Sequence, residues 1–269
     1  MRVNLKGLFA VTGLAVSLLL AACGEKEADM NKITVGVIAG SEAQVAEAAA
    51  KVAKDTYNLD VELVIFSDYV TPNAALEEGS IDANAFQHKP YLDQQMQDRG
   101  YDFAIAGNSF VYPIAAYSNS IQSTNELKDG DKIAVPNDPT NLARSLILLE
   151  QQGLITLKEG VGLKATVLDI VDSPKNLDIV ELEAAQLVRS MDDVALAIIN
   201  TTYASNINLS PEKDGVFVED KNSPYVNLIV ARKDNVQAEN VKKFVQAYQT
   251  EAVYQAAMTE FKDGVVKGW

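Results

Sequence analysis

Residues 135–149, VPNDPTNLARSLILL, decide the fold that we predict for this chain of 269 residues. The segment reads as the end of a buried strand, a tight polar turn and a helix. Asp138 is a typical N-cap residue, and Pro139 suits the first helical position, where the missing N–H has no intrahelical partner. Leucines at 142, 146 and 149 recur at helical spacing and would face a core. A strand that leads through a short turn into a helix is the repeating unit of α/β proteins.

The start of this predicted helix carries a candidate anion site. Asn141 and Arg144 are three residues apart, so they share one face close to the helix N-terminus. That end presents free backbone N–H groups and a partial positive charge, and an arginine fork beside an amide would receive a carboxylate or a phosphate. The alternative is an arginine that packs its stem against the protein and points to water.

Strands and helices alternate on both sides of this segment. The elements predicted before it are strands over 33–38, 61–66 and 81–86, with helices that begin at Ser41, Thr71 and Pro90. The elements predicted from 132 onward are strands over 132–135, 165–171, 177–182, 194–200 and 215–219 and helices over 139–152, 183–190, 239–250 and 251–261. Residues 41–44 (SEAQ) have the form of a capping box. Short connections in this order are typical of parallel βαβ units.

Two extended apolar stretches, 107–118 and 223–231, interrupt the alternation and contain no helix pattern. We interpret them as crossovers between two α/β lobes. This arrangement predicts a ligand cleft between the lobes.

Candidate site residues follow the predicted strands at their carboxyl ends, where ligands of open α/β sheets bind. Aromatic and polar side chains gather there: Phe66, Tyr69, Phe86, His88, Tyr91, Asn141, Arg144 and Asn200. An apolar pocket with a few fixed polar groups is typical of a small-ligand site. The alternative for the aromatic residues is the core, where such side chains are more often found.

Several function classes lack the residues that they need. His88 is the only histidine, and no Gly-x-Ser-x-Gly motif, Walker A motif or usual set of zinc ligands is present. Residues 160–165 (GVGLKA) match Gly-x-Gly-x-x-Ala but follow no predicted strand, so we interpret them as a loop. A formal net charge of −14 argues against nucleic acid and anionic lipid surfaces as partners. We therefore expect no enzyme, no metal and no cofactor.

The N-terminus reads as an export signal. Arg2 and Lys6 precede a short apolar run over 8–20, and small residues lead to Cys23. The run is too short for a comfortable membrane span, so we predict a signal peptide over 1–22 and a polar tether over 23–31. Cys23 is the only cysteine, which excludes a disulfide within one molecule. Residues 20–23 (LAAC) resemble a bacterial lipobox, which would make Cys23 the lipidation site, and an ordinary signal peptide is the alternative.

Three motifs resemble the NlpA/MetQ family of methionine-binding lipoproteins. They are residues 79–92 (GSIDANAFQHKPYL), 136–146 (PNDPTNLARSL) and 223–227 (SPYVN), in the family's order along nearly the whole chain after Cys23. The resemblance implies the type II periplasmic-binding-protein fold, with two α/β lobes that close on a ligand. Lobe 1 would comprise 32–112 with 226–269 returning to it, and lobe 2 would comprise 113–225.

The resemblance also implies roles for individual residues. Arg144 would bind the α-carboxylate of methionine with Asn141 beside it. Asn200 and Asn227 would accept hydrogen bonds from the α-ammonium or fix the backbone end of the ligand. The residues implied to surround the thioether chain are Phe66, Tyr69, Phe86, His88 and Tyr91. Sulfur near aromatic edges gains a little over plain burial, which suits methionine.

The implied function is that of a substrate-binding protein, which delivers methionine to an ABC importer with separate permease and ATPase chains. We expect a monomer in the cell envelope, anchored to the membrane through the lipid on Cys23, with its body in the periplasm or otherwise outside the cytoplasmic membrane. A methionine-containing dipeptide and another apolar amino acid are the alternative ligands. An enzyme on the same fold and a surface interaction protein are the alternatives from other classes.

Overall fold

A computed structural model describes residues 30–220, 223–262 and 264–269 of the chain. The predicted signal peptide, Cys23 and most of the predicted tether lie outside the described residues. Among those that are described, no helix has both the length and the apolar character that crossing a membrane requires.

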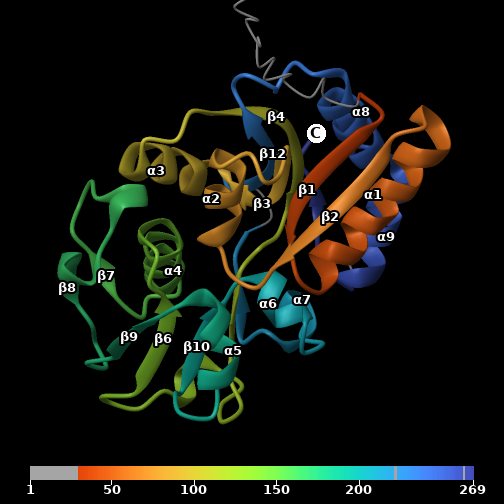
Figure 1. Cartoon of the computed structure of the whole chain (residues 1–269). Helices are drawn as coiled ribbons and strands as arrows, with labels where there is room; N and C mark the ends of the chain where they lie inside the picture. The colour runs from red at the N-terminus through yellow and green to blue at the C-terminus, as the bar shows by residue number, and fades with distance from the viewer. Residues whose placement is uncertain (1–29, 221–222, 263) are drawn as a thin grey trace, which may run out of the picture.

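The first of two bodies, which we call lobe 1, is built on a six-stranded sheet (Figure 1). The strand order is β13 (Val266–Lys267), β4 (Phe103–Val111), β12 (Val226–Arg232), β3 (Ala83–His88), β1 (Lys32–Ile38) and β2 (Asp60–Phe66). β1 pairs in parallel with β2 and β3, whereas β12 runs antiparallel to β3 and β4. The parallel part confirms the βαβ units predicted from the sequence.

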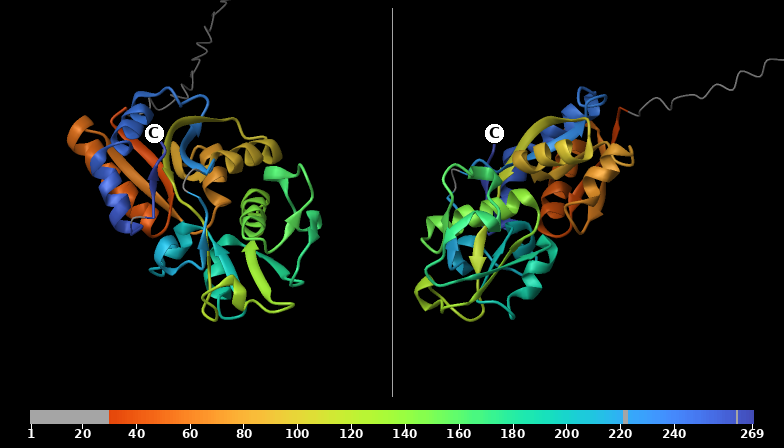
Figure 2. Two further views of the ribbon diagram at one scale, coloured as in Figure 1. Left: turned by 180° about the vertical axis from the view of Figure 1, so that it is seen from behind. Right: turned by 90° about the vertical axis from the view of Figure 1, so that its left-hand side faces the viewer.

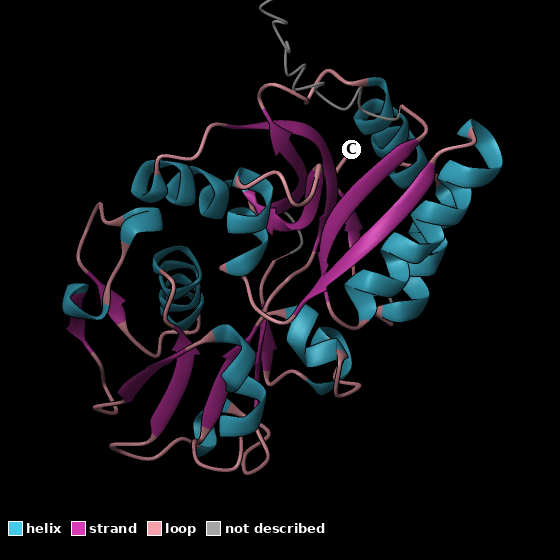
Figure 3. Ribbon diagram, in the orientation of Figure 1, coloured by secondary structure: helices cyan, strands magenta, loops and turns pink. Residues whose placement is uncertain are grey.

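Helices cover both faces of this sheet. On one face α1 (Ser41–Tyr57), α8 (Glu239–Tyr248) and α9 (Glu251–Glu260) pack together, and their apolar residues form the larger core cluster with β1 and β12. On the other face α2 (Thr71–Glu77) and α3 (Lys89–Arg99) bury Leu76 and Leu92 against Phe103 and Val230. Figure 3 shows the strands between these two helical layers.

The second body, lobe 2, is built on a five-stranded sheet. Its order is β11 (Phe217–Val218), β5 (Ala115–Tyr117), β10 (Leu196–Ile199), β6 (Lys132–Pro136) and β9 (Asp178–Leu182). The remaining elements are α4 (Pro139–Gln151), α5 (Leu187–Ser190), α6 (Thr201–Ser205), α7 (Pro211–Asp214), the hairpin of β7 (Thr156–Leu157) and β8 (Ile170–Asp172), and 3-10 turns at Thr124–Glu126, Gly162–Lys164, Val167–Asp169 and Ala184–Gln186. The turn at 162–164 agrees with our interpretation of 160–165 as a loop.

The chain passes between the lobes at two places, and Figure 2 shows the two bodies from two further sides. Residues 112–114 join β4 of lobe 1 to β5 of lobe 2, and residues 219–225 join β11 to β12. A third apolar cluster spans the lobes, since Phe86 and Tyr91 of lobe 1 pack with Ile199 and Tyr203 of lobe 2. The predicted two-lobed α/β fold is thus confirmed.

The predicted capping box at 41–44 is wrong. α1 begins with Gly40 at its N-cap, at a positive φ of 94°, and this residue has no side chain to cap the helix. The backbone N–H of Ser41 instead donates to Oδ1 of Asn206 at 3.3 Å. The hydroxyl of Ser41 donates to the carbonyl of Glu260, and the buried carboxyl of Glu42 accepts from the Thr202 hydroxyl at 2.8 Å. A tertiary contact between the lobes has replaced the local one.

Candidate functional site

The predicted N-cap of α4 fixes the first polar group of the site. Asp138 accepts hydrogen bonds from the backbone N–H and from Nδ2 of Asn141, both at 2.9 Å. With its amide nitrogen held in this way, the Oδ1 atom of Asn141 faces two donors. These are Nε2 of His88 at 3.2 Å, from lobe 1, and Nδ2 of Asn200 at 3.0 Å, from lobe 2.

His88 is held as a neutral imidazole. Its Nδ1 accepts from the backbone N–H of Tyr91 at 3.1 Å and thereby caps α3, so the proton of the neutral ring lies on Nε2. Burial lowers the pKa of His88 to about 3, and the neighbouring positive charge of Arg144 acts in the same direction. The imidazole therefore donates to Asn141 and adds no charge to the site.

Arg144 is buried and already carries several partners. Its Nε donates to Glu219 Oε1 at 2.8 Å, and Nη2 donates to Glu219 Oε2 and to the carbonyl of Tyr112, the latter at 3.0 Å. The ring of Tyr225 covers one face of the guanidinium, with its centroid 4.2 Å from Cζ. Within the described part of the chain, Nη1 is the guanidinium nitrogen that these bonds leave for a ligand. These contacts exclude the alternative in which Arg144 packs its stem against the protein and points to water.

Asn227 enters the site from β12. It lies opposite His88 of β3, and the register between the two strands shifts just beyond it, between Leu228 and Ile229. The Nδ2 atom of Asn227 donates to the carbonyl of Phe86 at 2.9 Å. Irregularities of this kind re-aim side chains near functional sites, and here the shift accompanies an amide on the wall of the cavity.

Aromatic rings from both lobes form the apolar part of the site. The ring of Tyr69 lies 5.9 Å from that of Phe86, 6.2 Å from Tyr91 and 5.0 Å from Tyr203, measured between centroids. The hydroxyl of Tyr91 donates to the Tyr69 carbonyl at 2.8 Å. These contacts fix the orientation of the rings in the wall of the site.

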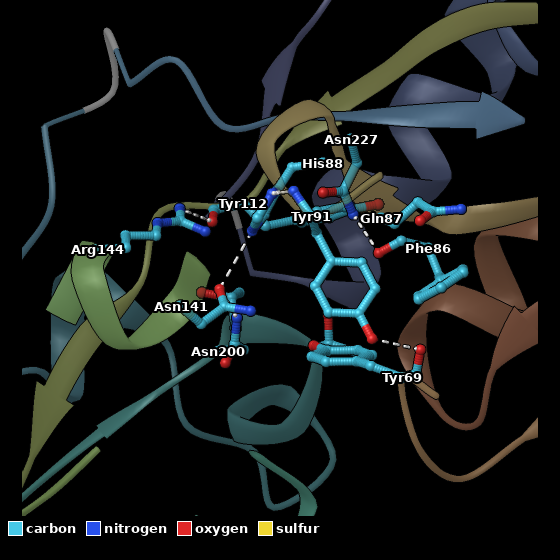
Figure 4. Close-up of a pocket in the computed structure, with 12 residues that line it drawn as sticks. Tyr69, Phe86, Gln87, His88, Tyr91, Tyr112, Asn141, Arg144, Asn200 and Asn227 are labelled. Atoms are coloured by element: carbon cyan, nitrogen blue, oxygen red, sulfur yellow. Dashed lines mark hydrogen bonds between the residues drawn. The ribbon is translucent and has the colours of Figure 1, made fainter. Parts of the chain in front are cut away.

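These groups surround a small cavity between the lobes (Figure 4). Its lining consists of Tyr69, Phe86, Gln87, His88, Tyr91, Tyr112, Asn141, Arg144, Asn200, Thr201, Thr202 and Asn227. Of the nine predicted ligand-binding residues, eight are in this set. Phe66 is not, because its ring fills the space beside Gly36, where an added Cβ would lie 2.9 Å from Phe66 Cε2.

One buried acceptor at the cavity lacks a donor. Oδ1 of Asn200 is buried and has no hydrogen-bond partner among the described residues, while its Nδ2 is committed to Asn141. An unsatisfied buried carbonyl oxygen costs roughly 1–3 kcal/mol. A ligand that brings an N–H donor to this point would remove that penalty.

Sequence reasoning missed several residues of the site. Thr201 and Thr202 directly follow Asn200, so their place after a predicted strand was a usable signal. Glu219 and Tyr225 lie behind Arg144 in the second crossover. No local pattern marked Glu219, whereas Tyr225 belongs to the motif at 223–227 but was given no role in the site. Among the described residues, no group of His, Cys, Asp and Glu side chains could hold a metal ion.

Comparison with known proteins gives a consistent answer. The family model of the NlpA lipoprotein matches residues 33–269. The chain is 68% identical over 269 residues to the probable D-methionine-binding lipoprotein MetQ of Vibrio cholerae serotype O1, and the match covers 100% of both chains. It is 66% identical to the D-methionine-binding lipoprotein MetQ of Escherichia coli K12, again over 100% of both chains.

Solved structures agree with these relatives. A crystal structure of the methionine-binding protein MetQ is 69% identical and superposes with a TM-score of 0.89, covering 90% of this chain and 99% of that one. A nutrient-binding protein from Burkholderia cenocepacia bound to methionine is 47% identical, with a TM-score of 0.86 and coverage of 88% and 100%. This chain therefore belongs to the NlpA lipoprotein family.

Proposed function

We propose that this protein is a lipid-anchored substrate-binding protein that takes up methionine in the cavity between its lobes and delivers it to an ABC importer. One observation carries the proposal most directly. A single cavity brings together an arginine nitrogen and a buried amide oxygen that have no hydrogen-bond partner among the described residues, and a wall of aromatic rings. These three features match the carboxylate, the ammonium and the thioether chain of methionine.

The carboxylate would lie against Arg144 Nη1, since Nε and Nη2 are held by Glu219 and Tyr112. The ammonium would donate to Oδ1 of Asn200, whose other end is fixed by Asn141. Asn227, on the opposite wall, would bind the same polar end of the ligand.

The thioether chain would lie among Tyr69, Phe86 and Tyr91. Contacts of sulfur with ring edges contribute roughly 0.3–1.5 kcal/mol each. We expect no turnover, because the cavity offers no activated nucleophile and its one imidazole is committed to two hydrogen bonds.

Delivery requires two states of the protein. Because the cavity is lined from both lobes, a ligand seated in it stabilises their approach, and a permease that recognises the closed pair would sense occupancy. We further propose that lobe 1 comprises 32–112 and 226–269, that lobe 2 comprises 113–225, and that the protein acts as a monomer tethered through Cys23. Membership of the NlpA lipoprotein family supports a place in the cell envelope.

Native mass spectrometry of the protein beginning at Gly24 tests this proposal. We expect a co-purified small molecule that is released on denaturation and has the mass of methionine. After the ligand is removed by unfolding and refolding, titration with L-methionine and D-methionine in separate calorimetric experiments would identify the preferred form. A protein that purifies empty and gives no heat with either form would refute the ligand assignment.

A further inference from the structure

The positive charge of the proposed carboxylate site is balanced inside the protein. Arg144 and Glu219 form an ion pair whose side chains are 3% and 11% exposed. The pair is bidentate, because Nε donates to Oε1 and Nη2 to Oε2. Such paired hydrogen bonds fix the orientation of a guanidinium as well as its charge.

Glu219 is itself held in place by the first crossover. Its backbone N–H donates to the carbonyl of Ile114 at 2.9 Å, and its Oε2 accepts from the Ile114 N–H at 3.4 Å. Glu219 does not line the ligand cavity. It lies on the far side of Arg144, in an outer groove that also contains Tyr225 and Leu163. The carboxylate can therefore act on a ligand only through Arg144 or through its field.

No other residue that lines the cavity carries a charge at neutral pH. The lining is otherwise made of amides, hydroxyls, aromatic rings and the neutral His88. Two carboxyl groups stand directly behind the lining. Asp138 caps the N-terminus of α4, where the helix offsets a negative charge, and burial raises the pKa of Glu42 to about 8, which keeps it protonated. The cavity with Arg144 and Glu219 is thus close to neutral.

We propose that Glu219 is the residue that makes this cavity select ligands without net charge. The inference rests on the proposed function, and it concerns which charge form of an amino-acid-like ligand is accepted. Glu219 holds Nη1 of Arg144 toward the cavity and cancels the guanidinium charge over the rest of the ligand. A zwitterion then finds a donor for its carboxylate and no excess positive potential at its ammonium. An anionic ligand of the same shape is repelled by Glu219. A cationic ligand has no carboxylate of its own with which to bind Arg144.

Glu219→Gln tests the proposal, because it removes the charge and keeps the size of the side chain. The three probes are methionine, its deaminated anionic analogue 4-(methylthio)butanoate, and the cationic amino alcohol methioninol, each titrated by calorimetry. Relative to methionine, we expect the anion to gain about tenfold in affinity in the variant and the cation to lose about tenfold. Asp93→Asn is the matched control, since it removes one charge from the exposed Lys89–Asp93 pair and should leave both ratios unchanged.

A purely structural role for Glu219 gives a different result. If the variant weakens the binding of all three probes by the same factor, Arg144 has lost its orientation, and charge selection by Glu219 is refuted. Glu219→Asp keeps the charge. The affinities of the anion and of the cation relative to methionine should therefore stay the same even where all three affinities fall, and a change in either ratio also refutes the proposal.

An observation without ligand separates this inference from the proposed function. In the wild-type protein, the Nε–H of Arg144 should be protected from solvent exchange in nitrogen-15 NMR spectra, because it donates to a buried carboxylate. Protection together with no methionine binding would refute the ligand and the selectivity while the ion pair stands. Rapid exchange in a protein that binds methionine would refute the role of Glu219 alone.

Discussion

Replacing Arg144 by methionine should separate folding from binding in this protein. The variant removes the guanidinium and keeps an unbranched stem against the Tyr225 ring. It leaves the Glu219 carboxylate almost buried without its cation, and the Tyr112 carbonyl without its donor. We therefore expect two effects, a loss of ligand affinity and a loss of stability, that a second substitution can distinguish.

The size of the stability loss follows from the contacts that disappear. Removing one partner of a buried ion pair destabilises a protein by about 3–5 kcal/mol, mainly because the other charge stays buried without compensation. Domains of ordinary size have an unfolding free energy of about 5–15 kcal/mol, so the variant should still fold at 25 °C. Adding Glu219→Gln removes the orphaned charge. The double variant should therefore recover most of the loss, although the ligand site stays without its cation.

Urea denaturation followed by circular dichroism measures the first effect, and calorimetry with methionine measures the second. We expect Arg144→Met to lower the urea midpoint and the double variant to return close to the wild type, with methionine binding absent from both. A single variant as stable as the wild type, or a double variant no more stable than the single one, would refute the argument from an uncompensated charge. Full binding by either variant would refute the role of Arg144.

Three further predictions follow from other contacts. Glu42→Gln should flatten the pH dependence of stability, because burial raises the pKa of Glu42 from 4.5 to about 8. The protonated carboxyl stabilises the folded wild type fully below pH 4.5, and the free energy of unfolding falls by up to about 1.4 kcal/mol per pH unit as pH rises toward 8. Urea denaturation at several pH values measures this slope in both proteins. Gly40→Ala should lower the unfolding free energy by about 1–3 kcal/mol, because φ is 94° and the new Cβ would overlap Asn206. Gly130 also has a positive φ but faces open space, so Gly130→Ala should lower the unfolding free energy less in the same assay. Asn227→Ala should weaken methionine binding about tenfold in calorimetry, and an unchanged affinity would place that residue outside the site.

Local sequence patterns predicted the parts of the site that depend on neighbours along the chain. Asp138 caps α4 through the Asn141 N–H, as its position before Pro139 indicated. The spacing of Asn141 and Arg144 placed both on the cavity, because three residues are close to one helical turn. The strand ends at 86–88 and 200 were predicted because ligands of open α/β sheets bind at the carboxyl ends of the strands, here one strand from each sheet.

Contacts between distant segments could not be predicted in this way. Glu219 meets Arg144 across 75 positions, and no motif surrounds it. The capping-box pattern at 41–44 was present in the sequence, yet Glu42 instead contacts Thr202, 160 positions away in the other lobe. Phe66 was placed in the site because it ends a strand, whereas the absent side chain of Gly36 gives its ring a place in the core. In each case a tertiary partner outweighed a local rule.

The arrangement around Asn141 explains how two lobes with separate cores can share one binding site. Its Oδ1 atom accepts from His88 of lobe 1 and from Asn200 of lobe 2, while Asp138 holds its nitrogen. His88 is fixed at its other ring nitrogen, because Nδ1 caps α3, and Asn200 is positioned by its backbone, which follows β10 and forms the N-cap of α6. Separation of the lobes would break the bond to His88 and keep the bond to Asn200. The acceptor left free on Asn200 would then stay with lobe 2 in either state, so a ligand held there first would meet the aromatic rings of lobe 1 only when the lobes approach.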